Sequence, residues 1–173
     1  MSRQPPGKGV GRVFMIVAWC AGLYLATQFF GRWEQRQANP NTEVASEQGE
    51  GYIEVKLLGN AQGHFVASGR INNVPVEFLL DTGATDVAVP LELARQLALP
   101  KGMPVTLNTA NGRTQGYQTR IDRLQLGAIV LRDVRAVAAP GLDGEQVLLG
   151  MSALNKLEFT QRGGTMLLRQ TTN

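Results

Sequence analysis

Residues 78–85 read Phe-Leu-Leu-Asp-Thr-Gly-Ala-Thr, and this stretch decides how the 173-residue chain is interpreted. The apolar run before Asp81 predicts a buried strand, so the carboxylate is expected at a strand end, at the edge of the core. Thr82 adds a hydroxyl, and Gly83 allows the backbone to turn sharply and to approach a neighbouring segment closely. These residues alone also fit an ordinary Asp-x-Gly turn after a strand. The rest of the sequence has to decide whether Asp81 is only a turn residue or a carboxylate that carries out chemistry.

The flanking sequence predicts a β-rich domain. Two predicted strands, 64–71 and 74–80, are joined at Asn72-Asn73, and asparagine tolerates the positive φ of a tight hairpin turn. Asn111-Gly112 is the strongest two-residue hairpin signal in the chain. Pro90 and helically spaced apolar residues predict one short helix, and a second is expected near the C-terminus. The remaining predicted elements are strands at 52–57, 87–89, 105–109, 114–126, 129–138, 147–149 and 165–169, and helices at 91–99 and 151–157.

Three features together resemble the retropepsin-like aspartic proteases, of the single-lobe, membrane-anchored bacterial type. In that family two hydrophobic residues precede Asp-Thr-Gly at the end of a hairpin, as they do in residues 78–85. Leu148-Leu149-Gly150 is similar to the family's second signature, which packs under the catalytic loop. Asn111-Gly112 lies between them, where the family places its flap hairpin. The resemblance covers residues 52–170 and implies a mostly β, single-lobe, closed β-barrel with one or two short helices.

The resemblance implies that Asp81 is the catalytic residue. Hydrolysis by water needs one carboxylate to take a proton and one carboxylic acid to polarise the carbonyl, and two close Asp side chains share one proton in this way. The chain has a single Asp-Thr-Gly, so the second Asp81 is expected from a second copy in a C2 homodimer. By the resemblance, Thr82 would hydrogen-bond to the partner's loop. The expected supporting residues are Thr82, Gly83, Ala84 and Thr85 at the site, Asn111 and Gly112 in the flap, and Leu148, Leu149 and Gly150 beneath the loop.

These residues predict an aspartic endopeptidase that cuts protein or peptide substrates. The alternative is a non-catalytic binding and dimerisation module with the same fold, although such a module has no reason to keep an intact Asp-Thr-Gly. The sequence from Gly150 to Leu154, with Ser152 at its centre, begins like a nucleophile elbow, but Leu154 replaces the final Gly and His64 is the sole candidate base. Ser152 is therefore interpreted as a helix-start residue.

Composition excludes several other kinds of site. With one Cys (Cys20) and one His (His64), one chain can form neither a disulfide nor a Cys/His zinc site, and we expect no metal and no cofactor. The 17 Lys+Arg and 14 Asp+Glu are spread along the chain, which argues against nucleic-acid binding. His64 is expected to have no role, and Asp86 has no assigned role because the family's aspartate matches Thr85 instead. Four arginines are expected on solvated strand faces, with a minor part in choosing acidic substrates: Arg120, Arg123, Arg132 and Arg135.

The N-terminal part of the chain predicts a membrane anchor. Val13–Phe30 carries no charge, and as a helix these residues would reach about 27 Å, close to the thickness of a bilayer core. The run is longer than the apolar part of a usual signal peptide, and no small-residue cleavage site follows it, so we expect an uncleaved transmembrane helix. Three basic residues precede the run (Arg3, Lys8 and Arg12), and two follow it (Arg32 and Arg36), offset by Glu34. This slight excess of positive charge before the run favours a cytoplasmic N-terminus.

The expected organisation therefore has four parts. A basic tail (1–12) precedes the transmembrane helix (13–30), and a flexible stalk (31–50) precedes the protease domain (51–173). The expected location is the cell inner membrane, crossed once, with the protease domain in the periplasm.

Overall fold

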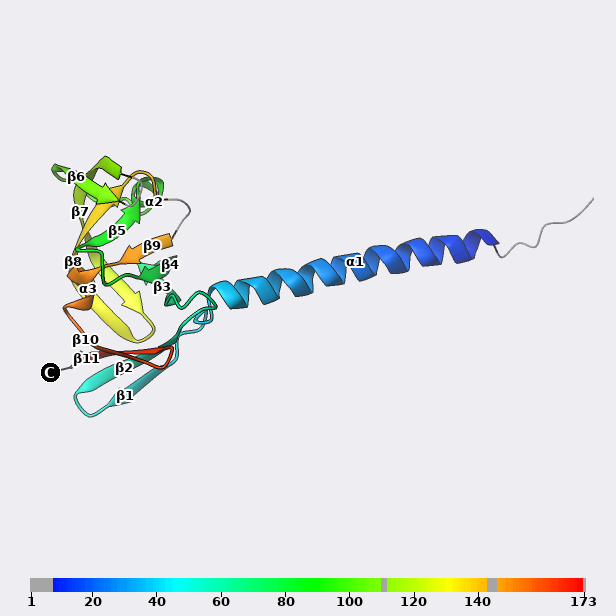
Figure 1. Ribbon diagram of the computed structural model, residues 1–173, viewed down its shortest axis with the longest axis horizontal. Coiled ribbons are helices and arrows are strands. Elements are labelled where there is room, and N and C mark those ends of the chain that lie inside the picture. Colours follow the sequence, from blue (N-terminus) through cyan, green and yellow to red (C-terminus); the bar gives the residue numbers. More distant parts are fainter. Residues whose placement is uncertain (1–7, 110–111, 143–145, 173) are drawn as a thin grey trace, which may run out of the picture. The chain divides into compact units, whose positions relative to one another are not determined.

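The structure is a computed structural model that describes residues 8–109, 112–142 and 146–172. The chain divides into two compact units, Met1–Gln37 and Ala38–Asn173 (Figure 1). The first consists, where described, of the long helix α1, Lys8–Ala38, which ends at the first residue of the second unit. Its stretch Gly11–Ala38 is long enough, and over an 18-residue window with a mean hydropathy of 1.8 apolar enough, to cross a membrane.

The second unit is built mainly from β-strands. Its described helices are short: α2 (Leu91–Gln96) and α3 (Met151–Leu154). Its strands in chain order are β1 (Ser46–Gly49), β2 (Tyr52–Leu58), β3 (Val66–Ile71), β4 (Val74–Leu80), β5 (Val87–Pro90), β6 (Pro104–Thr109), β7 (Gly112–Leu126), β8 (Ile129–Ala139), β9 (Gln146–Leu149), β10 (Glu158–Arg162) and β11 (Thr165–Thr171).

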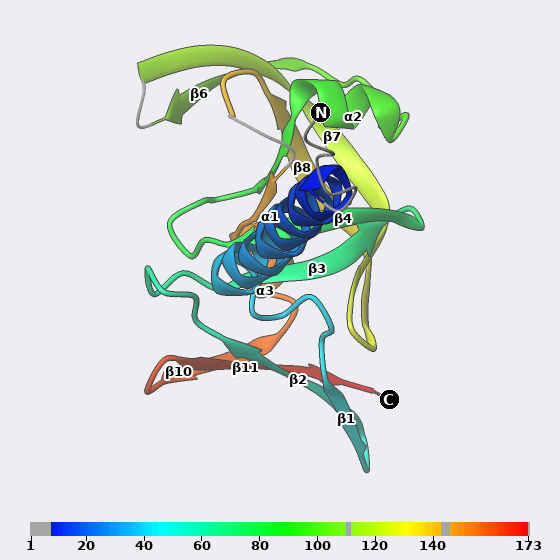
Figure 2. The same cartoon turned by 90° about the vertical axis from the view of Figure 1, so that its right-hand side faces the viewer.

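The strands form two sheets among the described residues. The larger has the order β3-β4-β9-β5-β8-β7-β6, and the smaller, at the lower end of the domain in Figures 1 and 2, has the order β1-β2-β11-β10. In the larger sheet β7 also pairs with β3, through Arg70–Gln125 and Ile71–Leu124, so six of its strands form a ring. The mostly β prediction is confirmed. The predicted closed barrel is not confirmed, because two residue pairs alone close this ring.

The hairpin β3–β4, which leads into Asp81, forms as predicted. Asn72 and Asn73 at its turn have φ of 46° and 70°, the positive values that asparagine tolerates. The turn also holds β7: the Asn72 N–H donates to the Arg123 carbonyl at 2.9 Å, and the Arg123 N–H donates to Asn72 Oδ1 at 3.1 Å. Asn72 in the turn thus fixes the hairpin to the neighbouring strand β7.

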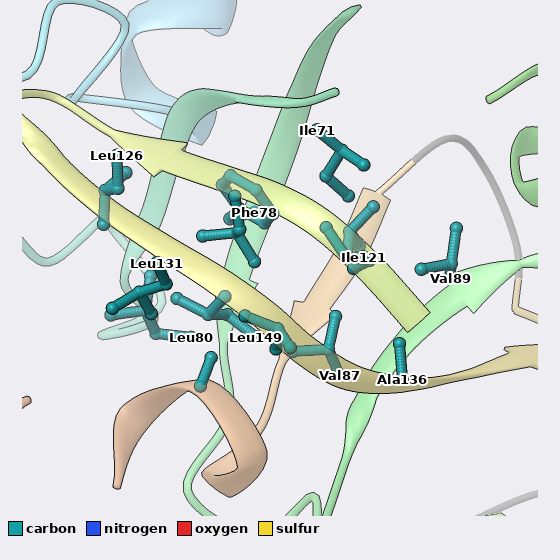
Figure 3. Close-up of a cluster of buried hydrophobic side chains, with 14 of the residues drawn as sticks. Ile71, Phe78, Leu80, Val87, Val89, Ile121, Leu126, Leu131, Ala136 and Leu149 are labelled. Atoms are coloured by element: carbon teal, nitrogen blue, oxygen red, sulfur yellow. The ribbon is translucent and has the colours of Figure 1, made fainter. Parts of the chain in front are cut away.

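Strands β7 and β8 curve around the core. The buried face of β7 changes between Ile121 and Leu124, and that of β8 changes between Val134 and Leu131. The register is the same on both sides of this change, but Asp122 and Asp133 are left out of the pairing. At this bend Asp133 adopts a φ of 54°. Because of the bend, both halves of each strand cover the same core. Figure 3 shows part of this core, a cluster of buried side chains that includes Phe78.

Two predicted helices are shorter than expected. The helix predicted at 91–99 ends at Gln96, because Ala98 turns back with φ of 50° and the Leu99 N–H donates to the Ala94 carbonyl. This turn buries both Leu97 and Leu99, which a continuous helix would not do. The helix predicted at 151–157 ends at Leu154. Strand β10 was missed because all its residues are exposed, so its sequence has no hydrophobic alternation.

In the structure, the segment predicted as a flexible stalk, residues 31–50, contains regular secondary structure. Helix α1 extends through its first part and β1 occupies its end. Between them lies a segment that we call the Asn strap, residues 39–41, in which Asn39 and Asn41 are each 4% exposed. The domain's hydrogen-bonded structure therefore begins at the strap and not at Gly51.

The Asn41 side chain acts as a substitute for a strand partner. Its Nδ2 donates to the carbonyls of Leu58 and Val66, at 2.8 and 2.7 Å, and its Oδ1 accepts from the Leu58 N–H at 2.8 Å. The Asn39 Nδ2 donates to Glu77 Oε2 at 2.8 Å. The sequence hides this role because isolated polar residues without a hydrophobic period are typical of linkers.

Candidate active site

Asp81 follows directly on the end of β4. There β4 runs parallel to β9, with Leu79 opposite Leu148 and Leu80 opposite Leu149. The Asp81 N–H continues this ladder by donating to the Leu149 carbonyl at 3.2 Å. The burial of β4 thus delivers a half-buried carboxylate to the end of the strand, and the structure adds that a second, parallel strand ends beside it.

The loop after Asp81 fixes the orientation of its carboxylate. The Gly83 N–H donates to Asp81 Oδ1 at 2.8 Å, and the Ala84 N–H donates to the Asp81 carbonyl at 3.2 Å, which together form an Asx-type turn. No hydrogen bond to Asp81 Oδ2 comes from the described part of the chain, so that oxygen is available to a reactant. Thr82 and Thr85 are exposed, as is Gly83, and Ala84 is half-buried.

The segment Leu148-Leu149-Gly150 lies against this loop. A Cβ at Gly150 would lie 2.7 Å from the Ala84 carbonyl oxygen and still nearer to that of Asp86, so only glycine fits. At the start of α3, the N–H of Met151 donates to the Ala84 carbonyl at 2.8 Å and that of Ser152 to the Thr85 carbonyl at 3.0 Å. Backbone donors that a helix start leaves free thereby hold the active-site loop.

Ser152 has a larger role than a helix-start residue. Its hydroxyl accepts from the Val87 N–H at 2.9 Å and donates to the Arg135 carbonyl at 2.7 Å, which joins α3 to β5 and β8. Asp86, to which the sequence gave no role, pairs with Arg135 at 2.6 Å between Oδ1 and Nε. No sequence signal links these partners, because 49 positions separate Asp86 from Arg135.

The predicted flap is the hairpin β6–β7. Its strands pair from Pro104–Tyr117 to Thr109–Gly112, and Gly112 has φ of 108°. Asn111, predicted at the tip, lies outside the described residues. Gly116 lets β7 pass closely over the Ala138 carbonyl, because a Cβ there would overlap that oxygen.

The other polar residues that the sequence singles out lie outside the contacts of the Asp81 loop described above. His64 is exposed, and its contact with Asn60 is made by its backbone N–H. Arg120 pairs with Asp133 at 2.5 Å, and this hydrogen bond lowers the pKa of the Asp133 carboxyl and raises the pKa of Arg120. No cluster of three or more His, Cys, Asp or Glu side chains that could hold a metal occurs in residues 8–109, 112–142 and 146–172.

Comparison with known proteins gives one family. Residues 67–156 match the family model described as "gag-polyprotein putative aspartyl protease". An uncharacterized protein in the cobV 5' region of Sinorhizobium sp. is 34% identical over 169 residues, covering 92% of this chain and 72% of that protein. The uncharacterized protein RP867 of Rickettsia prowazekii (strain Madrid E) is 29% identical over 122 residues, covering 69% of this chain and 50% of that protein.

The fold has a similar solved structure. The crystal structure of a retropepsin-like aspartic protease from Rickettsia conorii has a TM-score of 0.60 and 26% sequence identity, covering 75% of this chain and 97% of that one. The residues matched by the family model hold the loop at Asp81, the hairpin β6–β7 and the segment at Gly150. The fold and these matches establish that the chain belongs to the retropepsin-like aspartic protease family.

Proposed function

We propose that this protein is a membrane-anchored, homodimeric aspartic endopeptidase. The observation that carries the proposal is the geometry of Asp81. Its carboxylate lies at the meeting point of β4 and β9, one of its oxygens is oriented by the Gly83 N–H, and the loop behind it is held by α3. A carboxylate held in this way is half of the pair that activates water for peptide hydrolysis.

The second half comes from a second copy of the chain. A single Asp-Thr-Gly occurs in the sequence, and the exposed Thr82 hydroxyl has no hydrogen bond to any other described residue. In a C2 dimer the two Asp81 carboxylates lie on the axis, and each Thr82 is placed to bond the partner's loop. The pair then holds one proton between two carboxylates, because both cannot be charged at so short a distance.

The reaction uses this shared proton. The charged Asp81 takes a proton from the attacking water, while the protonated Asp81 donates to the oxygen of the scissile carbonyl. The hairpin β6–β7 covers an extended substrate, and Thr82, Gly83, Ala84 and Thr85 keep the two loops in place. Rate therefore depends on the singly protonated pair, and activity falls at both acidic and alkaline extremes.

Helix α1 anchors the enzyme, with the protease domain outside the cytoplasmic membrane. The support is the uncharged run Val13–Phe30 and the basic residues that precede it. A reporter that is active only in the periplasm, fused after Asn173, should be active. Activity of a cytoplasmic reporter at the same position, with a silent periplasmic one, would reverse the orientation.

The peptidase activity is tested by Asp81→Asn in the full-length chain in mild detergent. Cleavage of a denatured protein substrate should fall by at least about 10²–10⁴-fold, since the asparagine cannot take the proton of water. Asp122→Asn, at an exposed aspartate of β7, should cleave like the wild type. A wild-type chain that binds the substrate but never cuts it would support the rival binding module.

The dimer is tested by mixing wild-type and Asp81→Asn chains. With equal amounts and free exchange, about half of the wild-type chains pair with an inactive partner, so activity per wild-type chain should fall to about half. Activity that stays proportional to the wild-type chain alone would mean that each chain carries a complete site.

A further inference from the structure

A hollow with basic walls lies on the domain surface beside β8. It has a volume of about 470 Å³, and we call it the basic hollow, defined by Arg123, Val130, Leu131, Arg132, Lys156, Gln170 and Thr171. These residues come from β7, β8, the turn after α3 and β11. Three of the seven are cationic, and none of the described residues that line the hollow is acidic.

The structure separates four arginines that the sequence could not distinguish. Arg120 and Arg135 are neutralised by Asp133 and Asp86. By contrast, neither of the other two arginines nor the lysine in the basic hollow has an ion-pair partner in the described part of the chain. Three cationic side chains without an ion-pair partner among the described residues therefore line one hollow.

The backbone around the basic hollow already has its hydrogen-bond partners. The Gln170 side chain accepts from the Val130 N–H at 3.1 Å and donates to the Val130 carbonyl at 2.9 Å. The Lys156 ammonium donates to the carbonyls of Arg132 and Asp133, at 2.9 and 3.2 Å. What the hollow still offers to a ligand is mainly guanidinium N–H donors and positive charge.

One of these donors is buried without a partner. Arg123 Nε has no hydrogen-bond partner among the described residues, although Nη2 of the same side chain donates to Gln125 Oε1 at 3.2 Å. Leaving a buried charged donor unpaired is costly, and native structures seldom do so without a ligand or a water. Since Nε is closed to solvent, an acceptor from outside the chain would satisfy it only after the Arg123 side chain moves.

We propose that the basic hollow is an exosite that binds carboxylates of an acidic segment in the protein substrate, away from the bond that is cut. Planar guanidinium groups bind carboxylates with paired hydrogen bonds, and a hollow of this volume holds more than one side chain. Arg132 lies three residues before Arg135 on β8, about 10 Å of strand from the residue that binds Asp86 in the active-site loop. One extended polypeptide can therefore reach both places, and this proposal rests on the proposed peptidase function.

The test measures binding to a chain that cannot cut. Full-length Asp81→Asn protein in neutral detergent is titrated against a labelled peptide of about ten residues rich in Glu, and against the same peptide with Gln at each Glu. The Glu peptide should bind at least about tenfold more tightly, and its Kd should rise with salt. Adding Arg132→Gln should raise that Kd about threefold to tenfold, whereas Arg162→Gln, an equal charge change at an exposed site on β10, should leave it unchanged.

The outcomes distinguish the exosite from the proposed function. Equal binding of the two peptides, or equal Kd values for the Arg132 and Arg162 variants, would overturn the exosite and leave the peptidase proposal intact. Binding of inorganic phosphate but not of the Glu peptide would also overturn it, in favour of a site for small anions. In the active chain, Arg132→Gln should raise KM for a substrate with an acidic segment and leave kcat unchanged. If the wild type never cuts but binds the Glu peptide, the peptidase proposal fails and the hollow stands as a peptide-binding site.

Discussion

The active-site loop, residues 81–86, and the Asn strap, residues 39–41, are both irregular segments: the first follows β4 directly, and the second is bonded to β3 and β4. Backbone N–H groups of α3 hold the loop, and a glycine lets them come close. Amide side chains hold the strap, through bonds from Asn41 to both neighbouring strands and from Asn39 to Glu77. Both segments are well fixed, but by different parts of the chain.

Substitutions in the two segments should have different effects. The loop carries the reacting carboxylate, so a change that displaces its backbone should alter catalysis as well as folding. The strap carries no residue of the proposed mechanism, so a change there should reduce stability and leave the activity of the folded molecules intact.

The largest effect is expected from Gly150→Ala. The new Cβ would overlap the carbonyl oxygens of Ala84 and Asp86, so the loop must move. We expect a loss of about 3 kcal/mol in the free energy of unfolding and a fall of about a hundredfold in kcat/KM, because a misplaced reacting group is costly. Gly31→Ala in α1, where a Cβ meets nothing within 4 Å, is the control. Normal kcat/KM in a folded Gly150→Ala chain would contradict the proposed dependence of Asp81 on this contact.

The strap is tested by Asn41→Ala. The change leaves the Leu58 N–H and the carbonyls of Leu58 and Val66 without their partner, which should cost about 2–3 kcal/mol of unfolding free energy. The kcat/KM of the folded molecules should stay within about twofold of the wild type. The exposed Asn108→Ala, measured in the same denaturation experiment, should cost nothing measurable. A stable Asn41→Ala chain with lost activity would reverse the division between the two segments.

Hydrophobic periods and turn residues mark the part of the fold that the sequence could predict. They mark the strands around Asp81 and the hairpin at Asn72-Asn73. The approach of Gly150 to the loop was implied by the resemblance to the family and not by such a pattern. The strap was not predictable, because Asn39 and Asn41 resemble linker residues until the strands they complete are known. Side-chain contacts between distant positions, such as that of Ser152 with Arg135, leave no local pattern for the same reason.

Ser152→Ala tests the contact that joins the loop to the rest of the domain. It removes the acceptor of the Val87 N–H and the donor to the Arg135 carbonyl, so we expect a loss of about 1–2 kcal/mol. Since the backbone bonds of α3 to the loop remain, kcat should fall less than in Gly150→Ala. Thr85→Ala, at an exposed side chain of the loop, is the matched control for thermal unfolding. If both variants unfold like the wild type, the hydroxyl of Ser152 does not contribute to holding the loop.

The smallest effect is expected at the exposed ion pair between Arg120 and Asp133, which belongs to neither segment. Asparagine is the suitable substitute in Asp133→Asn, because it also tolerates the positive φ of this position. The hydrogen bond from Arg120 lowers the pKa of Asp133 in the folded chain, so its contribution to stability is present at neutral pH, where the carboxyl is charged in both states.

That contribution has a defined pH dependence. As the pH falls through the ordinary aspartate value of about 4, the unfolded chain takes up a proton before the folded one does, and the contribution is lost below the lowered pKa of the folded chain. The wild type should therefore be slightly more stable than Asp133→Asn at pH 7, and this difference should shrink as the pH is lowered below about 4. Thermal unfolding of both chains across this range, at low and high salt, measures it, with Arg120→Gln expected to give the same profile. A difference that grows on acidification would mean that Asp133 stabilises the bend of β8 through its backbone conformation and not through its charge.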